Sequence, residues 1–514
     1  MKKNKSIIGS SLMVIAVMLG SKFLGFIRQM VIASSYGSDI NTDIYFVSSD
    51  FMIGLSGALL SSLTTALITI YIDVTVKKDK NSANNVASKM LTLFLMASAV
   101  FIGLINMFAP FIAKFLAPSY NAADLDRLVL YLRIFSVTFI FTAFQSIYAA
   151  VLNANNSFVP GKLYGIVYNP IAIITVLLFS VQLGTKALII AYFLGNIIQT
   201  FLLKYLCSRT FNFRPSIRFD DENIKKLIWM SLPLLVSNIF VQLNSIIDKS
   251  ICSFLGEGFA SNYLYANTLE QFISATITAT LSLILLSQYA TYVSQGNTEM
   301  VIKTFRESLS GLLIFLAPIT AVVCSLSYDI VSIVYLRNQF NAEAALHTSY
   351  ALIGFGFGFV PVAFREMYMR LHFSYQDTKT PMFANIISVL INAVLSIVLA
   401  RYIGILGISL ATGISTVFTV AILNKSVKKY IPDFKLSSML TLIIKVLVSC
   451  ILAFGASQLM KYLSPDNLYI KFVLCAAAAV IVYLICLYIL KCKELYGLID
   501  NIKTRIICKI KKVH

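Results

Sequence analysis

The stretch SKFLGFIRQMVIAS, residues 21–34, decides the fold class because it is an apolar segment that carries two cations, Lys22 and Arg28. A fixed cation in the hydrocarbon core of a bilayer costs roughly 2.5 to 3.5 kcal/mol on insertion scales. Such residues occur in membrane helices mainly where they face a polar interior and serve a function. The segment is therefore predicted to be part of a membrane helix with a polar side.

The composition extends this interpretation to the whole chain. Of the 514 residues, 58% are hydrophobic and 13% are charged, whereas a soluble chain carries about 25% charge. The net charge of +19 could suggest nucleic-acid binding, but the cations lie in short connections between apolar runs. That distribution is the positive-inside pattern of membrane proteins. We therefore predict an all-α polytopic membrane protein that does not bind nucleic acid.

About fourteen apolar runs have the length of about 20 residues that a membrane helix needs. The even-numbered connections between them are rich in Lys and Arg, which predicts that both termini are cytoplasmic. The C-terminal tail adds five cations: Lys503, Arg505, Lys509, Lys511 and Lys512. The predicted spans lie near 7–33, 43–72, 90–117, 128–153, 162–182, 185–206, 227–248, 260–290, 308–327, 347–370, 382–402, 404–424, 439–461 and 469–491.

The first twelve spans are predicted to be a duplication of a six-helix unit. Two similar stretches contain Pro160 and Pro381, another two contain Gly37 and Gly256, and the separation along the sequence is nearly the same for both pairs. Transporters often contain such repeats, and an even number of helices gives both copies the same orientation. The predicted parts are an N-terminal lobe (1–206), a cytoplasmic linker (207–226), a C-terminal lobe (227–430), and two further helices with a basic tail (431–514).

Four spans, the first two of each repeat, carry polar side chains along one face. Asp43 and Asp50, for example, are seven residues apart and share a helical face. The polar residues could pair with one another across a packed bundle. Stripes at equivalent places in both halves favour a shared hydrated cavity for an anionic, hydrogen-bonding cargo. The polar residues on these spans include Lys22, Arg28, Asp43, Asp50, Asp248, Lys249, Asn267 and Glu270.

Several long stretches resemble MurJ/MviN-type lipid II flippases, which belong to the MOP transporter superfamily. The resemblance runs from about residue 10 to residue 430, and the two extra C-terminal helices also fit. It implies a V-shaped pair of lobes that works by alternating access. Such a protein moves a polyprenyl-pyrophosphate glycan across the bacterial inner membrane, from the inner to the outer leaflet. The stretches are SKFLGFIRQMVIASSYGSDINTDIYFV, YLRIFSVTFIFTAFQSIYAAVLNANNSFVPG, IIDKSICSFLGEGFASNYLYANTL and FSYQDTKTP.

The resemblance also assigns roles to residues. Lys22 stands where the family has a cavity arginine, Arg28 is the arginine of the GFxR stretch, and Asp43 is the aspartate of the TD pair. The family's cavity arginines contact the pyrophosphate, which guanidinium binds bidentately. The substrate-binding residues are therefore predicted to be Lys22, Arg28, Asp43, Asp50, Asn267 and Glu270.

Two departures from the family pattern leave the cargo open. Ser56-Gly57 stand where the family usually has a basic pair, and its ADR motif reads Ala266-Asn267-Thr268. A flippase for another lipid-linked saccharide, of the capsule or O-antigen type, is therefore an alternative.

Some members similar to this chain have a sodium site between the seventh and eleventh helices. That likeness makes Asp248 a candidate ligand, joined by Asp377 or Asn392, because hard cations prefer oxygen ligands. Ordinary helix-terminal and loop roles are the alternative. We expect no cofactor and no other metal, with transport driven by sodium, protons or the membrane potential.

Two other functions compete with a flippase. A multidrug cation antiporter would favour acidic and aromatic cavity groups over Lys22 and Arg28. A membrane glycan polymerase or ligase usually carries a long external loop with catalytic residues, which the sequence lacks. We therefore expect a transporter rather than an enzyme. The expected partners are the lipid-linked glycan, membrane lipids and the cell-wall synthesis machinery, and the expected state is a monomer.

Overall fold

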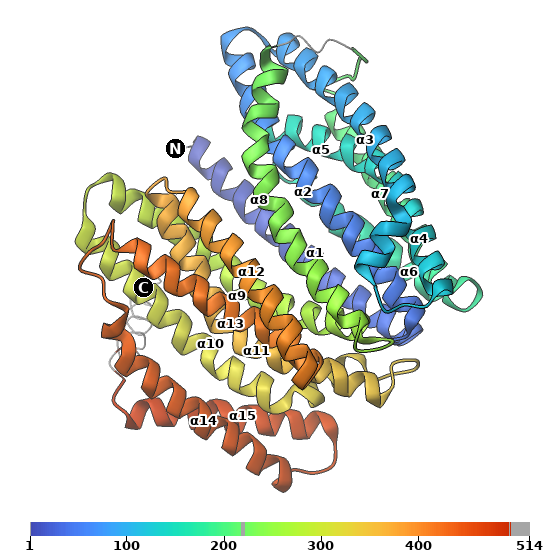
Figure 1. Ribbon diagram of the computed structural model, residues 1–514. Helices are drawn as coiled ribbons and strands as arrows, with labels where there is room; N and C mark the ends of the chain where they lie inside the picture. Colours follow the sequence, from blue (N-terminus) through green and yellow to red (C-terminus); the bar gives the residue numbers. More distant parts are fainter. Residues whose placement is uncertain (1, 217–221, 493, 495–514) are drawn as a thin grey trace. The chain divides into compact units, whose positions relative to one another are not determined.

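The computed structural model describes residues 2–216, 222–492 and 494, and the regular structure within them is helical (Figure 1). The predicted all-α fold class is confirmed. The predicted basic tail (Lys503, Arg505, Lys509, Lys511 and Lys512) and part of the predicted linker lie outside the described residues.

Fifteen α-helices and two short 3-10 turns make up the described chain. They are α1 (Lys2–Tyr36), α2 (Ile40–Lys77), α3 (Lys80–Leu116), α4 (Ala122–Val137), α5 (Phe139–Ala154), η1 (Pro160–Lys162), α6 (Tyr164–Leu183), α7 (Lys186–Cys207), α8 (Glu222–Ser253), α9 (Phe259–Ser294), α10 (Thr298–Tyr335), α11 (Ala342–Ser374), α12 (Lys379–Ile403), α13 (Ile405–Val427), η2 (Leu436–Met439), α14 (Leu440–Leu463) and α15 (Leu468–Ile489).

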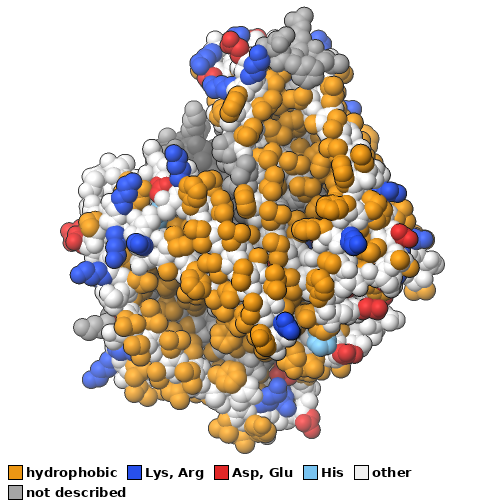
Figure 2. Space-filling view, in the orientation of Figure 1, with side chains coloured by type: hydrophobic (Ala, Val, Ile, Leu, Met, Phe, Trp, Pro, Cys, Tyr) orange, Lys and Arg blue, Asp and Glu red, His pale blue; other side chains and the backbone are white. Residues whose placement is uncertain are grey.

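Twelve segments of the described chain are long and apolar enough to cross a membrane, with α4 and α5 together forming one of them. Helices α8 and α9 coincide with two further predicted spans but are not among the twelve, so the count of fourteen stays a prediction. On the face shown in Figure 2, apolar side chains form a broad cover, as expected of a surface that faces lipid.

The helices pack as two compact units. Unit 1 comprises Met1–Thr268 and Arg337–Ala344, and unit 2 comprises Leu269–Leu336 and Ala345–His514. Helix α8 and the first part of α9 therefore pack with the N-terminal helices. The predicted division into lobes follows the sequence repeat instead, and it stays a prediction.

The duplication inferred from the sequence has a counterpart in the helix boundaries. The starts of α2 and α9 are separated by the same number of residues as the starts of α7 and α13. Gly184 and Gly404 precede α7 and α13 with nearly the same backbone angles, φ 54°, ψ −143° and φ 59°, ψ −141°. Glycine adopts such positive φ angles without steric cost, so both copies of this turn keep a glycine.

Each unit has its own apolar core. In unit 1 the core joins α2, α3, α5 and α7, with Leu67, Met90 and Ile147 fully buried. In unit 2 the ring of Phe305 packs edge-on against the rings of Tyr368 and Phe434, with centroids 4.9 and 5.0 Å apart. Helices α14 and α15 form a pair that packs on α10 (Figure 1). Close packing of this kind holds membrane helices together, since lipid removes the hydrophobic drive between them.

A buried carboxylate fixes the turn between α8 and α9 within unit 1. Asp43, in the first turn of α2, is fully buried. It accepts hydrogen bonds from the backbone N–H groups of Gly258 and Ser261, both at 2.7 Å, and from the Ser261 hydroxyl. Asp43 thus satisfies N–H groups at the start of α9 that have no partner inside the helix. The turn itself packs so closely on Ser38 that a side chain at Gly258, where φ is +82°, would collide with it.

We predict that Asp43→Ala lowers the free energy of unfolding by about 3 kcal/mol, because it leaves buried donors without an acceptor. The melting temperature of the purified protein in detergent would measure the loss. Asp79→Ala is the matched control: Asp79 caps the exposed start of α3 by accepting from Ser82 N at 3.0 Å, and its loss should cost about 1 kcal/mol. Equal and small losses in the two variants would show that the Asp43 contacts do not hold the turn.

Candidate functional site

Arg28 lies in α1 against a group of tyrosines from α6. Its guanidinium carbon is 5.0 Å from the centroid of the Tyr168 ring, a distance at which a cation is attracted to an aromatic face. Tyr168 in turn stacks on Tyr164, with centroids 5.5 Å apart. The Nε of Arg28 is buried and has no hydrogen-bond partner among the described residues. The side chain therefore keeps a donor to offer.

The close approach of α1 and α6 sets the position of Arg28. Asn169 Nδ2 donates to Ser21 O at 3.0 Å. A Cβ at Gly165 would collide with the Ser21 hydroxyl, so glycine at that place allows the two helices to touch. Small residues at helix contacts serve the same purpose in many membrane proteins.

Helices α2 and α8 lie side by side in unit 1 and are joined by polar contacts (Figure 1). Lys249 Nζ is 2.5 Å from Asp50 Oδ2, and the Lys249 side chain is only 9% exposed. Farther along the same contact, Asn238 Nδ2 donates to Ser62 Oγ at 3.0 Å. The sequence left open the alternative that polar residues pair with one another across a packed bundle. The ion pair of Asp50 and Lys249 is such a pairing.

The charges near Arg28 do not balance. Its electrostatic partners are Tyr168, Tyr45, Tyr164 and Asp50. Asp50 already pairs with Lys249, so that one carboxylate serves two cations among the described groups. Among the described groups, Arg28 therefore has no carboxylate that pairs with it alone, which makes its surroundings suited to an anion.

The other predicted substrate-binding residues are placed differently. Asp43 is enclosed by the α8–α9 turn, and those contacts explain its burial without a ligand. Lys22 is exposed and Asn267 is half-buried, both in unit 1. Glu270 belongs to unit 2, where it accepts a hydrogen bond from Ser274 Oγ at 2.7 Å. Their roles in binding stay predictions.

The predicted cation ligands have separate surroundings. Asp248, in unit 1, is 2% exposed and accepts from the Tyr263 hydroxyl at 2.9 Å. In unit 2, Asp377 precedes α12, whereas Asn392 lies more than three turns into it. Three and a half turns of helix span about 20 Å, so Asp377 and Asn392 cannot bind the same ion. Within the described chain, no three His, Cys, Asp or Glu side chains are grouped as a metal site.

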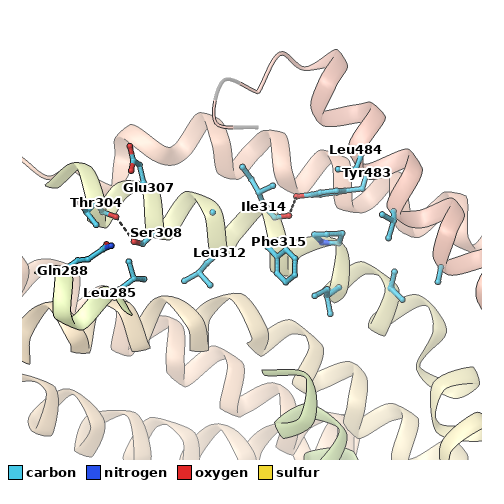
Figure 3. Close-up of a pocket in the computed structure, with 16 residues that line it drawn as sticks. Leu285, Gln288, Thr304, Glu307, Ser308, Leu312, Ile314, Phe315, Tyr483 and Leu484 are labelled. Carbon is cyan, nitrogen blue, oxygen red and sulfur yellow. Dashed lines mark hydrogen bonds between the residues drawn. The ribbon is translucent and has the colours of Figure 1, made fainter. Parts of the chain in front are cut away.

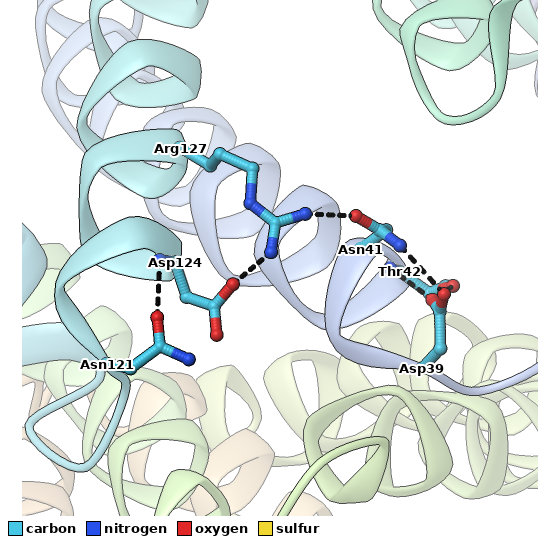
Figure 4. Close-up of polar contacts among 6 residues, drawn as sticks. All are labelled: Asp39, Asn41, Thr42, Asn121, Asp124 and Arg127. Carbon is cyan, nitrogen blue, oxygen red and sulfur yellow. Dashed lines mark hydrogen bonds and ion pairs between the residues drawn. The ribbon is translucent and has the colours of Figure 1, made fainter.

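A hydrogen-bonded network ties the α1–α2 connection to α4 (Figure 4). Asp39 caps α2 by accepting from Thr42 N at 2.8 Å. Arg127 donates to both Asn41 Oδ1 and Asp124 Oδ1. The guanidinium of Arg127 therefore has carboxylate and amide partners, in contrast to that of Arg28. This network borders a polar pocket of about 500 Å³.

Unit 2 contains an apolar groove of about 880 Å³ between α9, α10 and α15 (Figure 3). Leu312 and Phe315 line it from α10, and Leu484 lines it from α15. Its polar residues, among them Gln288, Thr304 and Glu307, gather at one end in Figure 3. The sequence gives no sign of this groove, because α10 and α15 are far apart in the chain and share no polar pattern.

The sequence profile of the family described as "Lipid II flippase MurJ" matches residues 32–489. The chain belongs to this family. The resemblance seen in the sequence is thus confirmed, as is the prediction of a multi-span membrane transporter rather than an enzyme. The tyrosines beside Arg28, Tyr164 and Tyr168, belong to no motif that the sequence had singled out.

Curated relatives of the family cover nearly the whole chain. "Probable lipid II flippase MurJ" of Rickettsia prowazekii (strain Madrid E) is 25% identical over 465 residues, which are 88% of this chain and 90% of the relative. The protein of the same name from Bdellovibrio bacteriovorus is 22% identical over 511 residues, 96% of each chain.

Two solved structures show the same fold. "Lipid II flippase MurJ, inward closed conformation" aligns with a TM-score of 0.80 at 21% identity, covering 93% of this chain and 98% of that one. A multidrug resistance MATE family transporter of the MOP superfamily, in an inward-facing conformation, aligns with a TM-score of 0.67 at 13% identity, covering 80% and 94%. The fold is therefore shared by the family and by other MOP transporters.

Asp377 lies outside the membrane-spanning segments, and the stability that it contributes should depend on pH. Burial opposes its ionisation, but hydrogen bonds from Thr380 N and the Tyr430 hydroxyl, both at 3.0 Å, outweigh burial and lower its pKa. A lowered folded-state pKa contributes stability above the unfolded pKa of about 3.9, and the contribution is lost as pH falls through the folded value.

We expect Asp377→Asn to reduce the melting temperature at pH 7, and the difference from the wild type to shrink as the pH falls below about 4. Melting curves of the two proteins from pH 7 to pH 3 would show this. Asp466→Asn, at an exposed aspartate with no hydrogen bond in the described chain, should follow the wild type throughout. A difference that stays constant over the range would contradict the role given to the Asp377 carboxylate.

Proposed function

We propose that the protein carries lipid II from the inner to the outer leaflet, and that Arg28 contacts the pyrophosphate. The position of Arg28, whose nearby carboxylate Asp50 is already paired with Lys249, carries this proposal. The buried Nε–H of Arg28 has no acceptor in the described chain, and a phosphate oxygen would supply one. A guanidinium can donate two parallel hydrogen bonds to phosphate, while the Tyr168 ring holds it in place.

Lys22 fits a first contact on the same path. It is exposed and precedes Arg28 by six residues, which is about 9 Å along a helix. With a cytoplasmic N-terminus, Lys22 is nearer than Arg28 to the leaflet from which the cargo comes. An anionic head group would then meet the flexible ammonium group first and the more enclosed guanidinium second.

The groove of unit 2 is suited to the polyprenyl tail of the same cargo. Its lining is mostly apolar, and its volume of about 880 Å³ is in the range of small-molecule sites. A lipid-linked glycan needs a polar path for its head group and an apolar path for its tail, because neither half is stable in the other's surroundings. The groove of unit 2 would supply the apolar path.

The remaining details of the proposal come from the sequence. We propose that the protein lies in the bacterial inner membrane with both termini cytoplasmic, acts as a monomer, and works beside the cell-wall synthesis machinery. Among the coupling candidates, Asp248 is favoured, because it is a carboxylate buried in a helix of unit 1. Sodium, protons or the membrane potential would drive the lobes between their two states.

The alternative functions fit the charges less well. A multidrug cation would be repelled by the guanidinium of Arg28, since like charges brought together oppose binding. A flippase for another lipid-linked saccharide would use the same pyrophosphate contact and differ only in the glycan. Complementation of a strain that lacks its own lipid II flippase distinguishes that alternative from lipid II as the cargo.

Arg28→Ala is expected to abolish rescue of a bacterium depleted of its own lipid II flippase, whereas the wild type should restore growth. Loss of a buried charged contact costs roughly 2 to 5 kcal/mol of binding, or at least thirtyfold in affinity. Arg28→Lys should rescue in part. Arg401→Ala, at an exposed arginine in the last turn of α12, is the control and should rescue fully. A C-terminal tag confirms that each variant is inserted.

Full rescue by Arg28→Ala would refute the pyrophosphate contact. Failure of the inserted wild type to rescue growth would reject lipid II as the cargo and favour another lipid-linked saccharide.

A bulky residue in the groove tests the tail contact. A Cβ atom added at Gly311, which lines the groove, would meet no atom within 4 Å. Gly311→Phe should therefore fold and lower photocrosslinking of a benzophenone-labelled polyprenyl pyrophosphate to α10 by about fivefold, the effect of roughly 1 kcal/mol. Gly103→Phe is the control, because Gly103 in α3 is equally open and lies outside the groove. Unchanged crosslinking in Gly311→Phe would place the tail elsewhere.

A further inference from the structure

Unit 1 contains a second pocket whose lining differs from that of the apolar groove. It lies between α2, α5, α7 and the segment from η1 into α6, and its volume is about 470 Å³, within the range of small-molecule sites. Its lining includes many hydroxyl and amide side chains beside apolar ones, among them Ser56, Thr142, Gln145, Asn196 and Gln199.

Two hydrogen-bond acceptors in this pocket lack a partner. Gln199 is 1% exposed, and its Oε1 is buried without a hydrogen bond in the described chain. Asn153 Oδ1 is buried in the same way. Both residues line the pocket. An unsatisfied polar atom is costly, and inside a membrane bundle bulk water does not offset that cost. Rotation of either amide about its last side-chain bond exchanges its oxygen and nitrogen, so a molecule in the pocket can hydrogen-bond to these two groups.

The neighbouring amide groups are already committed to one another. Gln145 Nε2 donates to Asn196 O at 3.1 Å, to Asn196 Oδ1 at 3.2 Å and to Thr200 Oγ1 at 3.1 Å. Asn196 Nδ2 donates to Tyr192 O at 2.9 Å. These donors hold the wall in one arrangement and are not directed at Gln199. A ligand that completes the pocket must bring its own O–H or N–H groups.

The charge of the lining narrows the ligand further. Lys162, an exposed residue of η1, is the charged side chain among the described lining residues, which include no carboxylate. The pocket thus suits a neutral or anionic molecule and does not suit a cation. The rings of Tyr164 and Tyr192 add aromatic surface, which is common in sites for small organic ligands.

We infer that this pocket binds the glycan part of the cargo, as a saccharide rich in hydroxyl and amide N–H groups. The inference rests on the proposed function and adds a second contact to it. Arg28 holds the pyrophosphate, and the pocket distinguishes a glycan-bearing lipid from the bare lipid pyrophosphate. Gln199 and Asn153 accept hydrogen bonds from the saccharide, and Lys162 is near the end from which the head group enters.

Binding to the full chain in lipid nanodiscs tests the inference, with lipid II and undecaprenyl pyrophosphate as the two probes. Gln199→Leu should weaken lipid II binding about tenfold, the effect of one buried hydrogen bond of roughly 1.4 kcal/mol, and leave undecaprenyl pyrophosphate binding unchanged. Asn153→Leu tests the second acceptor independently and should show the same selectivity. Gln182→Leu, at an exposed position near the end of α6, is the control and should alter neither affinity.

The melting temperature without ligand separates binding from folding. Gln199→Leu removes an acceptor that has no partner in the described chain, so its melting temperature should not fall. Equal losses for both probes, or no loss for either in both pocket variants, would overturn the glycan site while leaving the pyrophosphate contact intact. If the wild type binds neither probe, the proposed function fails and the glycan site fails with it.

Discussion

The carboxylate of Asp43 is the interaction on which the arrangement of unit 1 depends. By accepting from the backbone at the start of α9, it holds the α8–α9 turn against the start of α2. Helix α8 then runs beside α2, which brings Lys249 to Asp50. Because Asp50 is occupied by that pair, Arg28 has no carboxylate of its own among the described residues. The charge left at Arg28 thus follows from a structural contact at one end of the bundle.

Much of the fold could be predicted from the sequence, because it depends on local patterns. Apolar runs of membrane length located the helices, and the offset between Gly37 and Gly256 agrees with the offset between the starts of α2 and α9. The number of membrane spans was less certain. Helices α8 and α9 coincide with two of the predicted spans, but they include side chains that the structure does not describe, so the count of fourteen stays a prediction.

The candidate site was harder to predict, because the sequence shows which residues share a helix face but not what they meet. The stripe that contains Asp43 and Asp50 was interpreted as the lining of one cavity. In the structure, Asp43 contacts a distant backbone and Asp50 an ammonium group. Tyr168 and Gln199 carry no motif, and their importance follows from which groups around them lack partners. Unsatisfied hydrogen-bonding groups arise from the way helices pack, so the sequence of one helix does not reveal them.

The contacts of Asp43 also affect how this turn can change during evolution. Two of its three hydrogen bonds go to backbone N–H groups, which every residue except proline possesses. Substitutions at position 261 therefore need no matching change at position 43. A search for correlated substitutions would overlook this contact, although it joins segments that are far apart in the sequence. In an alignment of relatives, the contact would appear as an aspartate that stays constant at position 43 while the residue at position 261 varies.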